Sequence, residues 1–299
     1  MNNKLSAGIN QYYEHLITDF EPDSGVFWCY ANPSPRPCFT PELLRDLLGN
    51  LHDIKNSNSA DIRAGQSPKI SYLVLGSYRP GVFSLGGDLD LFVRCIKSGD
   101  REKLANYMRL SIEVLYGTHT NMDVPLTTIA LIRGNALGAG FEGALSCDYI
   151  VAEKHVQLGF PEVLFNMFPG MGAYSFLSRR IRPAEVERMI LSGRIYTAEE
   201  LFDIGVIDHL AESGKGVEST REFIRLHNKN NNTRRSLLKI RNLINPVTLE
   251  ELLDIGEIWV EAAMRLSSRE LKIMERLIRS QDKVAKTLVK TEADNIQIA

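Results

Sequence analysis

The chain has 299 residues, of which 44% are hydrophobic and 24% charged, a composition typical of a packed globular protein and unlike that of a disordered or fibrous one. Its 35 basic and 37 acidic residues leave a formal net charge of -2, which creates no long-range field to attract nucleic acid or an anionic membrane. No segment approaches the ~18 apolar residues of a membrane span, and the first residues lack the pattern of a secretory signal. The four cysteines form no CxxC pair, so neither a metal site nor a disulfide framework is indicated, and we expect a cytoplasmic protein.

The N-terminal part predicts a strand, a helix and then a second strand. Residues 25–31 (GVFWCYA) read as a strand, and an amphipathic helix is expected to begin near Pro41. Residues 55–69 (KNSNSADIRAGQSPK) are polar without periodicity, which predicts a surface loop. The apolar run at 70–77 is typical of a buried strand. A glycine turn follows it, and the pattern DLDLFVRCI at 88–96 predicts a helix.

The central part repeats this order of strand, turn and helix. Apolar residues recur every three or four positions over 100–119, which predicts a long helix. A buried strand is expected at 126–133, a glycine-rich turn at 134–140, a short helix at 141–147 and another strand at 149–152. Strands that alternate with helices indicate an α/β core.

The C-terminal part predicts helices alone. Thr197 and Glu200 have the spacing of a capping box, for a helix that ends near Gly205. After about Gly216 the strand patterns stop, and successive helices are expected through Val289, with breaks near Asn230 and Pro246 and a frayed terminus over 290–299. Such a helical tail either covers the core or packs against another subunit, and the sequence does not choose between the two.

Two glycine-rich loops each follow a buried strand and precede a helix: FSLGGDLDLF at 83–92 and GNALGAGFEGALSCD at 134–148. The first N–H groups of a helix have no intrahelical partner, and the peptide dipoles there favour negative charge. Glycine lets a substrate carbonyl approach such an N–H closely. If the two loops converge they make an oxyanion hole, and otherwise they are ordinary tight turns. The candidate residues are Gly86, Gly87, Gly138, Ala139 and Gly140.

Glu142 and Glu162 are the candidate acid and base. Both lie in apolar segments, where a carboxylate is costly to bury without a partner or a task. The interval between them allows a helix end, a strand and a turn to bring the second carboxylate back to the first. Two carboxylates in one pocket can have their pKa values pushed apart, leaving one as acid and one as base. The alternative is that each faces solvent at the start of its own helix.

Three segments, FSLGGDL, GNALGAGFEGALSCD and LGFPEVLFNMFPGMGAY, resemble in order and spacing the signature of the crotonase (enoyl-CoA hydratase/isomerase) superfamily. The resemblance covers about residues 15–210. Within the superfamily, segments such as ERMILSGRIY and EIWVEAAMRL are most similar to the bacterial diffusible signal factor synthases, which make cis-2-unsaturated fatty acid signals. Ala139 stands where hydratases usually have glycine, which keeps the N–H group.

The resemblance implies a role for each candidate residue. It assigns the oxyanion N–H groups to Gly87 and Ala139, the shaping of the turns beside the substrate to Gly86 and Gly140, and catalysis to Glu142 and Glu162. It assigns Met171 and Trp259 to the acyl pocket. The alternative for the last two residues is ordinary core packing.

The resemblance also implies a fold and an organisation. The expected fold is α/β, a crotonase spiral of ββα units with a helical C-terminal region. We divide the chain into a spiral core with the catalytic site, residues 1–215, and a helical region, residues 216–299, that covers the acyl pocket, mediates oligomerisation, or does both. Family members usually form trimers or dimers of trimers.

The activity implied is dehydration of a 3-hydroxyacyl chain on acyl carrier protein, followed by hydrolysis of the thioester to a cis-2-enoic acid that serves in quorum sensing. No metal or redox cofactor is expected. One alternative is an enoyl-CoA hydratase or isomerase of fatty-acid metabolism. Another is a non-catalytic binding partner of a signalling sensor protein, a family to which the synthases also bind. Basic residues at 234–241 (RRSLLKIR) could meet an acidic carrier protein or the phosphate of its arm, or form a solvated helix face.

Overall fold

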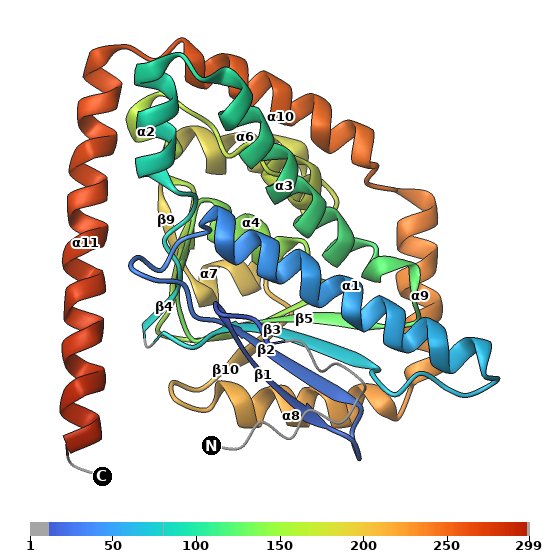
Figure 1. Ribbon diagram of the computed structural model, residues 1–299. Coiled ribbons are helices and arrows are strands. Elements are labelled where there is room, and N and C mark those ends of the chain that lie inside the picture. The colour runs from blue at the N-terminus through green and yellow to red at the C-terminus, as the bar shows by residue number, and fades with distance from the viewer. Residues whose placement is uncertain (1–11, 80, 298–299) are drawn as a thin grey trace.

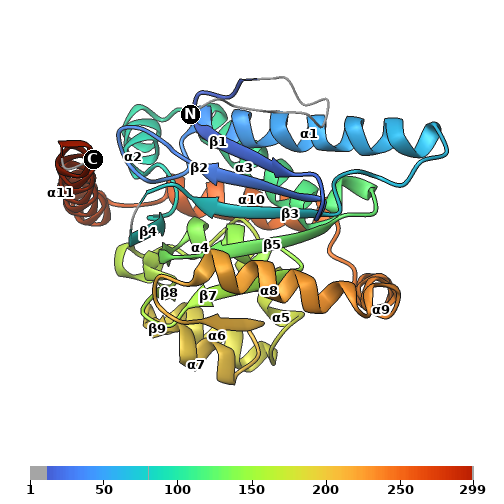
Figure 2. The same ribbon diagram turned by 90° about the horizontal axis from the view of Figure 1, so that it is seen from below.

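The computed structural model describes residues 12–79 and 81–297, with side chains as far as residue 286. Two sheets form its centre (Figures 1 and 2). The larger sheet has the order β1 (Leu16–Glu21), β2 (Val26–Ala31), β3 (Tyr72–Ser77), β5 (Thr127–Ile132), β7 (Tyr149–Glu153) and β10 (His209–Ala211). The smaller sheet has the order β4 (Gly81–Ser84), β6 (Gly134–Leu137), β8 (Gln157–Gly159) and β9 (Ile195–Thr197). Pairing is antiparallel for β1 with β2 and for β8 with β9, and parallel elsewhere.

Helices follow the strands as the sequence predicted. Those of the core are α1 (Pro41–Arg63), α2 (Leu89–Ser98), α3 (Arg101–His119), α4 (Ala139–Leu145), α5 (Ala173–Ser178), α6 (Pro183–Ser192) and α7 (Ala198–Asp203), with short 3₁₀ segments η1 (Asn121–Asp123) and η2 (Pro161–Phe165). Those of the C-terminal region are α8 (Gly216–Asn228), α9 (Asn231–Ile244), α10 (Leu249–Met264) and α11 (Ser268–Gln297). The predicted capping box of α7 is present, with Thr197 and Glu200 each bonded to the other's backbone N–H.

The chain winds through the two sheets in repeated units. Three times a strand of the large sheet is followed by a strand of the small sheet and then by a helical segment: β3 and β4 lead to α2, β5 and β6 to α4, and β7 and β8 to η2. This is the spiral of ββα units expected from the sequence, and the predicted fold class is confirmed.

Both faces of the large sheet are buried because helices cover each of them. Along β2 and β3, Phe27, Cys29 and Leu73 belong to the main core on one face, whereas Trp28 and Val74 belong to a smaller cluster on the other. α8 covers the smaller cluster, and α1, α3 and α10 lie across the main core (Figure 1). Parallel strands covered on both sides explain the continuous apolar runs in the sequence.

The polar segment 55–69 is not a loop over its whole length, contrary to our prediction, because α1 continues to Arg63. Two of its polar side chains are buried and bind the chain that returns beneath the helix. Asn58 exchanges two hydrogen bonds with the backbone of Ile70, at 2.8 and 3.3 Å, and Asp61 accepts from the N–H of Lys69 at 3.1 Å. These polar residues therefore bind the helix to the segment that leads into β3.

The short strands of the small sheet also differ from the prediction. We expected residues 134–140 to form a turn, but the first four of them form β6, and β4 was not anticipated. Gly134 belongs in a strand here because the two strands cross closely, and a Cβ on Gly134 would lie 2.1 Å from the backbone nitrogen of Val82. A close approach of two backbones is one of the uses of glycine within strands.

The C-terminal helices have the predicted breaks near Asn230 and Pro246 and a further break between α10 and α11. The segment expected to fray continues α11 as far as Gln297. α9 and α11 lie on opposite sides of the molecule in both views (Figures 1 and 2). Within the described residues, no helix is long and apolar enough to cross a bilayer. The division of the chain at residue 215 stays a prediction.

Candidate active site

Three turns of the small sheet meet at one edge. β4, β6 and β8 are parallel, so their carboxyl ends lie side by side. After these ends come Gly86 and Gly87, then Gly138 and Ala139, and then Glu162. The repeated ββα unit therefore delivers both glycine loops and one candidate carboxylate to the same place.

The two glycine loops converge as an oxyanion hole requires. A Cβ on Gly86 would lie 3.6 Å from the amide nitrogen of Ala139, so the two backbones are in contact. Within the described part of the chain, the N–H groups of Gly87 and Ala139 find no acceptor. The Ala139 N–H is free because it begins α4, and the peptide dipoles of that helix add positive potential there. Both amides are available to a thioester oxygen.

Gly138 lets the second loop pass close to Glu162. Its φ of 53° and ψ of -127° lie outside the usual range of residues with a side chain. A Cβ at this position would lie 2.3 Å from Oε1 of Glu162. A side chain on residue 138 would therefore displace the carboxylate.

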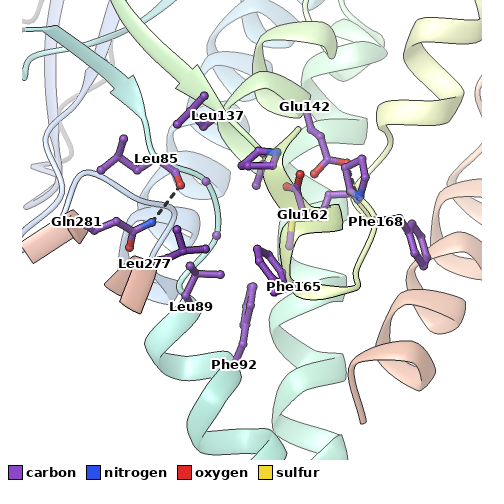
Figure 3. A pocket seen from close by; sticks show the side chains of 18 of the residues that line it. Leu85, Leu89, Phe92, Leu137, Glu142, Glu162, Phe165, Phe168, Leu277 and Gln281 are labelled. Atoms are coloured by element: carbon purple, nitrogen blue, oxygen red, sulfur yellow. Dashed lines mark hydrogen bonds between the residues drawn. The ribbon is translucent and has the colours of Figure 1, made fainter. Parts of the chain in front are cut away.

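These residues line a cavity of about 280 Å³. The resemblance assigned a role to eight residues, and seven of them lie on the cavity wall: Gly86, Gly87, Ala139, Glu142, Glu162, Met171 and Trp259. Figure 3 shows the side chains of Glu142 and Glu162 next to each other on one side, with leucine and phenylalanine side chains around the remainder. The eighth, Gly140, is not on the wall. It packs against Ser84, whose Cβ would lie 2.7 Å from a Cβ on residue 140.

Glu142 is 1% exposed and lies in the first turn of α4. Its Oε1 accepts hydrogen bonds from the backbone N–H groups of Met171, at 2.7 Å, and Ala173, at 3.0 Å. Burial raises the pKa of Glu142 to about 7, and the backbone hydrogen bonds oppose that rise. Donors that are fixed in the backbone favour the charged form of this carboxylate.

Glu162, unlike Glu142, lacks backbone donors in the described part of the chain to stabilise a negative charge on its buried Oε2 atom. It follows Pro161 at the start of η2, and its Oε2 is buried without a hydrogen-bond partner among the described residues. Burial, together with the nearby charge of Glu142, raises the pKa of Glu162 to about 8. With less support for a negative charge, Glu162 is the member of the pair that holds a proton more readily.

Because burial raises the pKa of both carboxyl groups toward neutral pH, the two can act as an acid and a base there. The backbone donors favour the charge on Glu142 and the proton on Glu162. Beside them, two residues whose amides have no acceptor among the described residues, Gly87 and Ala139, line the apolar cavity. Chemically, this arrangement can stabilise an enolate or a tetrahedral oxyanion while moving protons at neighbouring atoms.

The far wall of the cavity is aromatic and comes from distant parts of the chain. Trp259 of α10 lies on Gly170, where a Cβ would be 2.3 Å from the indole Cδ1 atom. Phe92 of α2 meets Trp259 edge to face, with ring centroids 5.0 Å apart. Met171 is 3% exposed beside them. Met171 and Trp259 thus line the cavity, as the resemblance implied, and they also pack in the core, which was the alternative.

Sequence reasoning missed two groups of residues at this site. From α11, Leu277, Gln281 and Val284 line the cavity, and Gln281 donates to the carbonyl of Leu85 at 3.2 Å. Their spacing indicates that they share one buried face of an amphipathic helix, but it does not indicate which part of the protein that face covers. Tyr107 supports Gly87 from below and donates to the carbonyl of Phe39 at 2.7 Å, and nothing near it in the sequence indicated this role.

Comparison with known proteins agrees with the geometry. The profile of the enoyl-CoA hydratase/isomerase family matches residues 31–243, which is more than half of the chain. The chain belongs to this family. It is therefore a crotonase-family enzyme of the hydratase/lyase type, and the coarser part of the resemblance drawn from its motifs is confirmed.

Individual family members are distant from this chain. A probable enoyl-CoA hydratase of Mycobacterium avium is 24% identical over 204 residues, covering 68% of this chain and 72% of its own. The crystal structure of an enoyl-CoA hydratase from Bacillus halodurans has a TM-score of 0.72 and 21% identity, covering 88% of this chain and all of the other. That of DspI from Pseudomonas aeruginosa has a TM-score of 0.62 and 24% identity, covering 80% of this chain and 83% of the other. At these identities the solved structures show a shared fold.

Proposed function

We propose that the protein dehydrates a 3-hydroxyacyl chain held as a thioester on acyl carrier protein and then hydrolyses the thioester, releasing a cis-2-unsaturated fatty acid. The observation that carries this proposal is the presence of two carboxylates beside two free amides in one apolar cavity. The motifs that resemble the signal factor synthases support the cis product and the use of the free acid in quorum sensing. The chemistry needs no metal or redox cofactor.

In the dehydration, the thioester oxygen accepts hydrogen bonds from the N–H groups of Gly87 and Ala139. The reaction begins from the less favoured protonation state, in which the proton has moved from Glu162 to Glu142. Ionised Glu162 then removes the proton on the α carbon, and the oxyanion hole stabilises the enolate. Glu142, in its protonated form, donates its proton to the β hydroxyl, which leaves as water while the double bond forms. After this step Glu162 is protonated and Glu142 is ionised.

The hydrolysis uses the state that the dehydration leaves. Ionised Glu142 takes a proton from a water molecule as its oxygen bonds to the thioester carbonyl carbon, and the same two amides stabilise the tetrahedral oxyanion. When the carbon–sulfur bond breaks, Glu162 protonates the departing thiolate. Glu142 is then protonated and Glu162 ionised, so the pair returns to the state that begins the cycle.

The product distinguishes this function from its main alternative. Purified protein is incubated with 3-hydroxyacyl chains on acyl carrier protein or on CoA, and the mixture is examined by mass spectrometry. We expect free cis-2-enoic acid, formed by the wild type and not by Glu162→Gln. A trans-2-enoyl thioester that accumulates without free acid would contradict the proposal.

The alternative is an enoyl-CoA hydratase, and one observation favours it. The hydrogen bonds favour ionised Glu142 and protonated Glu162 at rest, which is the state needed to add water across a double bond, with Glu142 activating the water and Glu162 protonating the α carbon. The names of the curated relatives agree with this direction. Addition of water to a trans-2-enoyl-CoA, followed by the loss of its ultraviolet absorption, tests it.

Two partner proposals accompany the catalytic one. Oligomerisation is typical of the family, and we propose a homotrimer or a hexamer, which light scattering on the purified chain would measure. We also propose that a cognate sensor protein binds this chain. A pull-down with the sensor, repeated with Glu142→Gln, would test whether binding is independent of catalysis.

A further inference from the structure

α11 has two faces with different tasks. Leu277, Gln281 and Val284 line the acyl cavity, and Leu271 and Met274, 7% and 1% exposed, pack into the core. These positions recur every three or four residues, so they lie on one side of the helix. The helix is therefore a wall of the candidate active site as well as a surface element.

The outer face of α11 is a stripe of positive charge. It carries a basic residue at every third or fourth position for 18 residues, and all of these side chains are exposed. The basic stripe consists of Arg269, Lys272, Arg276, Arg279, Lys283 and Lys286. The whole chain has a net charge of -2, so basic residues are not in excess overall. The positive charge on this face of α11 is therefore a local feature of the surface.

Two acidic residues of α11 are paired with basic residues of other segments. Glu275 binds Lys97 of α2 at 2.6 Å, and Asp282 binds Arg36 at 2.5 Å. Both ion pairs lie on the side of the helix that faces the body of the protein, and they fix its position there. The Arg276 and Arg279 guanidinium groups have no ion pair within 4 Å among the described residues.

The acyl cavity opens beside this stripe. Ser280 is exposed and also lines the cavity, whereas the other residues of the lining are buried or half-buried. On the helix, Ser280 is one turn from Arg276, adjacent to Arg279 and three residues from Lys283. Solvent therefore reaches the cavity at the edge of the basic stripe.

We propose that the basic stripe of α11 is the docking surface for an acidic acyl carrier protein, which places the carrier's thioester arm at the opening beside Ser280. This inference rests on the proposed function, because it names the surface that receives the thioester. Complementary charge speeds and orients such encounters. A membrane or nucleic acid would also be attracted to a basic helix, but neither explains why the stripe borders the opening of a thioester cavity.

The other basic cluster of the chain, at 234–241, is a less suitable dock. Arg234 lies 2.8 Å from Nε2 of His227, and Arg241 lies 3.6 Å from the buried carboxylate of Asp148. Its helix, α9, lies on the side of the molecule opposite α11 (Figure 1). α9, together with Lys229 at the end of α8, therefore provides a control site for changes of charge.

The test reverses charge in the stripe and compares two substrates. The variant combines Arg276→Glu with Arg279→Glu, and the control combines Lys229→Glu with Lys239→Glu, which changes net charge equally on exposed residues far from the opening. Each protein is assayed with an acyl chain on acyl carrier protein and with the same chain on the small thiol N-acetylcysteamine. Thermal unfolding checks that both variants are folded.

We expect the stripe variant to lose roughly ten- to a hundredfold in kcat/KM with the carrier-bound substrate and to keep wild-type kcat/KM with the small thioester. The control should match the wild type with both. Added salt should lower the wild-type rate with the carrier and leave the stripe variant nearly unchanged. Equal losses with both substrates, or no loss with the carrier, would overturn the docking proposal.

Direct binding separates this inference from the proposed function. Fluorescence anisotropy of labelled acyl carrier protein needs no turnover, and we expect salt-sensitive binding that the stripe variant loses and the control retains. If the wild type turns over neither substrate, the proposed function fails while binding still decides the docking surface. Binding to anionic lipid vesicles with none to the carrier would show that the stripe serves a different partner.

Discussion

Glu142 is fully buried and Glu162 is half-buried, with its Oε2 atom buried, and the two differ in what surrounds their oxygens. Two backbone N–H groups point at Oε1 of Glu142, whereas Oε2 of Glu162 has no partner among the described residues. Because burial penalises the charged form of both, the pKa of each carboxyl is raised, and the backbone donors decide which one keeps the charge. The assignment of acid and base thus depends on a few hydrogen bonds.

The first prediction at this scale concerns turnover. Replacing Glu142 or Glu162 with Gln removes a proton-transfer group while keeping shape and hydrogen-bonding capacity. We expect kcat to fall by ~10²–10⁴ for each variant with the fold intact. Steady-state kinetics and circular dichroism measure the two effects. A variant with wild-type activity would exclude that residue from the mechanism.

The second prediction concerns stability and pH. Because burial raises the pKa of Glu162 to about 8, the folded protein holds a proton that the unfolded chain has already lost between about pH 5 and pH 8. The free energy of unfolding should therefore fall as pH rises through this window. Glu162→Gln removes the contribution of Glu162 and leaves that of Glu142, whose pKa is also raised. We expect the variant to show a weaker pH dependence and to exceed the wild type in stability at pH 8 by on the order of 1–3 kcal/mol.

Urea unfolding at pH 5 and pH 8 measures this difference. Glu261→Gln is a suitable control because its side chain is 59% exposed. Parallel pH dependence in the wild type and Glu162→Gln would mean that Glu162 is not the buried proton carrier.

At the scale of elements, the site depends on tight passages from short strands to helices. β4 and β6 have four residues each, so the loops after them are held at fixed positions relative to each other. Gly138 lies where the second loop turns into α4, and its unusual backbone angles aim the Ala139 N–H and leave room for Glu162.

Gly138→Ala tests this passage. The added Cβ would meet Oε1 of Glu162 at 2.3 Å in a backbone conformation that alanine disfavours, so we expect a loss of about 1–3 kcal/mol in stability and most of the activity. Gly99→Ala is the matched control, since its φ of 71° is also left-handed but its Cβ would meet nothing within 4 Å. It should lose stability and keep activity. Equal activity in both variants would contradict the role of Gly138.

At the scale of the whole molecule, the cavity is assembled from segments that lie far apart in the chain. Phe92, Gly170 and Trp259 meet in one wall, and Gln281 of α11 closes another. The C-terminal helices α10 and α11 are thus part of the cavity wall. A role of the C-terminal helices in joining subunits is a separate prediction. Leu243 and Ile244 of α9 are exposed apolar residues that a subunit contact could cover, and the oligomeric state of the purified chain tests this.

Trp259→Ala tests the shared wall. Removing a buried indole should cost ~3–5 kcal/mol in unfolding free energy and enlarge the cavity. We expect the ratio of kcat/KM values for long and short acyl chains to shift toward the long chains. Ile258→Ala, on the same helix but 56% exposed, should leave the ratio unchanged. An unaltered ratio in Trp259→Ala would mean that the indole packs the core without limiting the acyl chain.

Much of the fold was predictable because its signals are local. The buried strands, the helices at 101–119 and after residue 216, and the capping box at Thr197 all follow from apolar periodicity or from the chemistry of adjacent residues. The failures have a common cause. The polar residues of α1 bind the distant backbone at Ile70, and Gly134 belongs to β6 because another strand crosses it, so neither could be recognised from its neighbours in the sequence.

By itself the sequence determined the residue types of the site and their order: two loops with free amides at helix starts and two glutamates in apolar surroundings. The tertiary structure alone decided that these groups share one cavity, that Glu142 has backbone donors and Glu162 lacks them, and that α11 closes the wall and presents its basic stripe at the opening. The physical reason is range. Backbone propensity and periodicity act over a few residues, whereas burial, desolvation and hydrogen bonds to distant backbone exist only once the chain has folded.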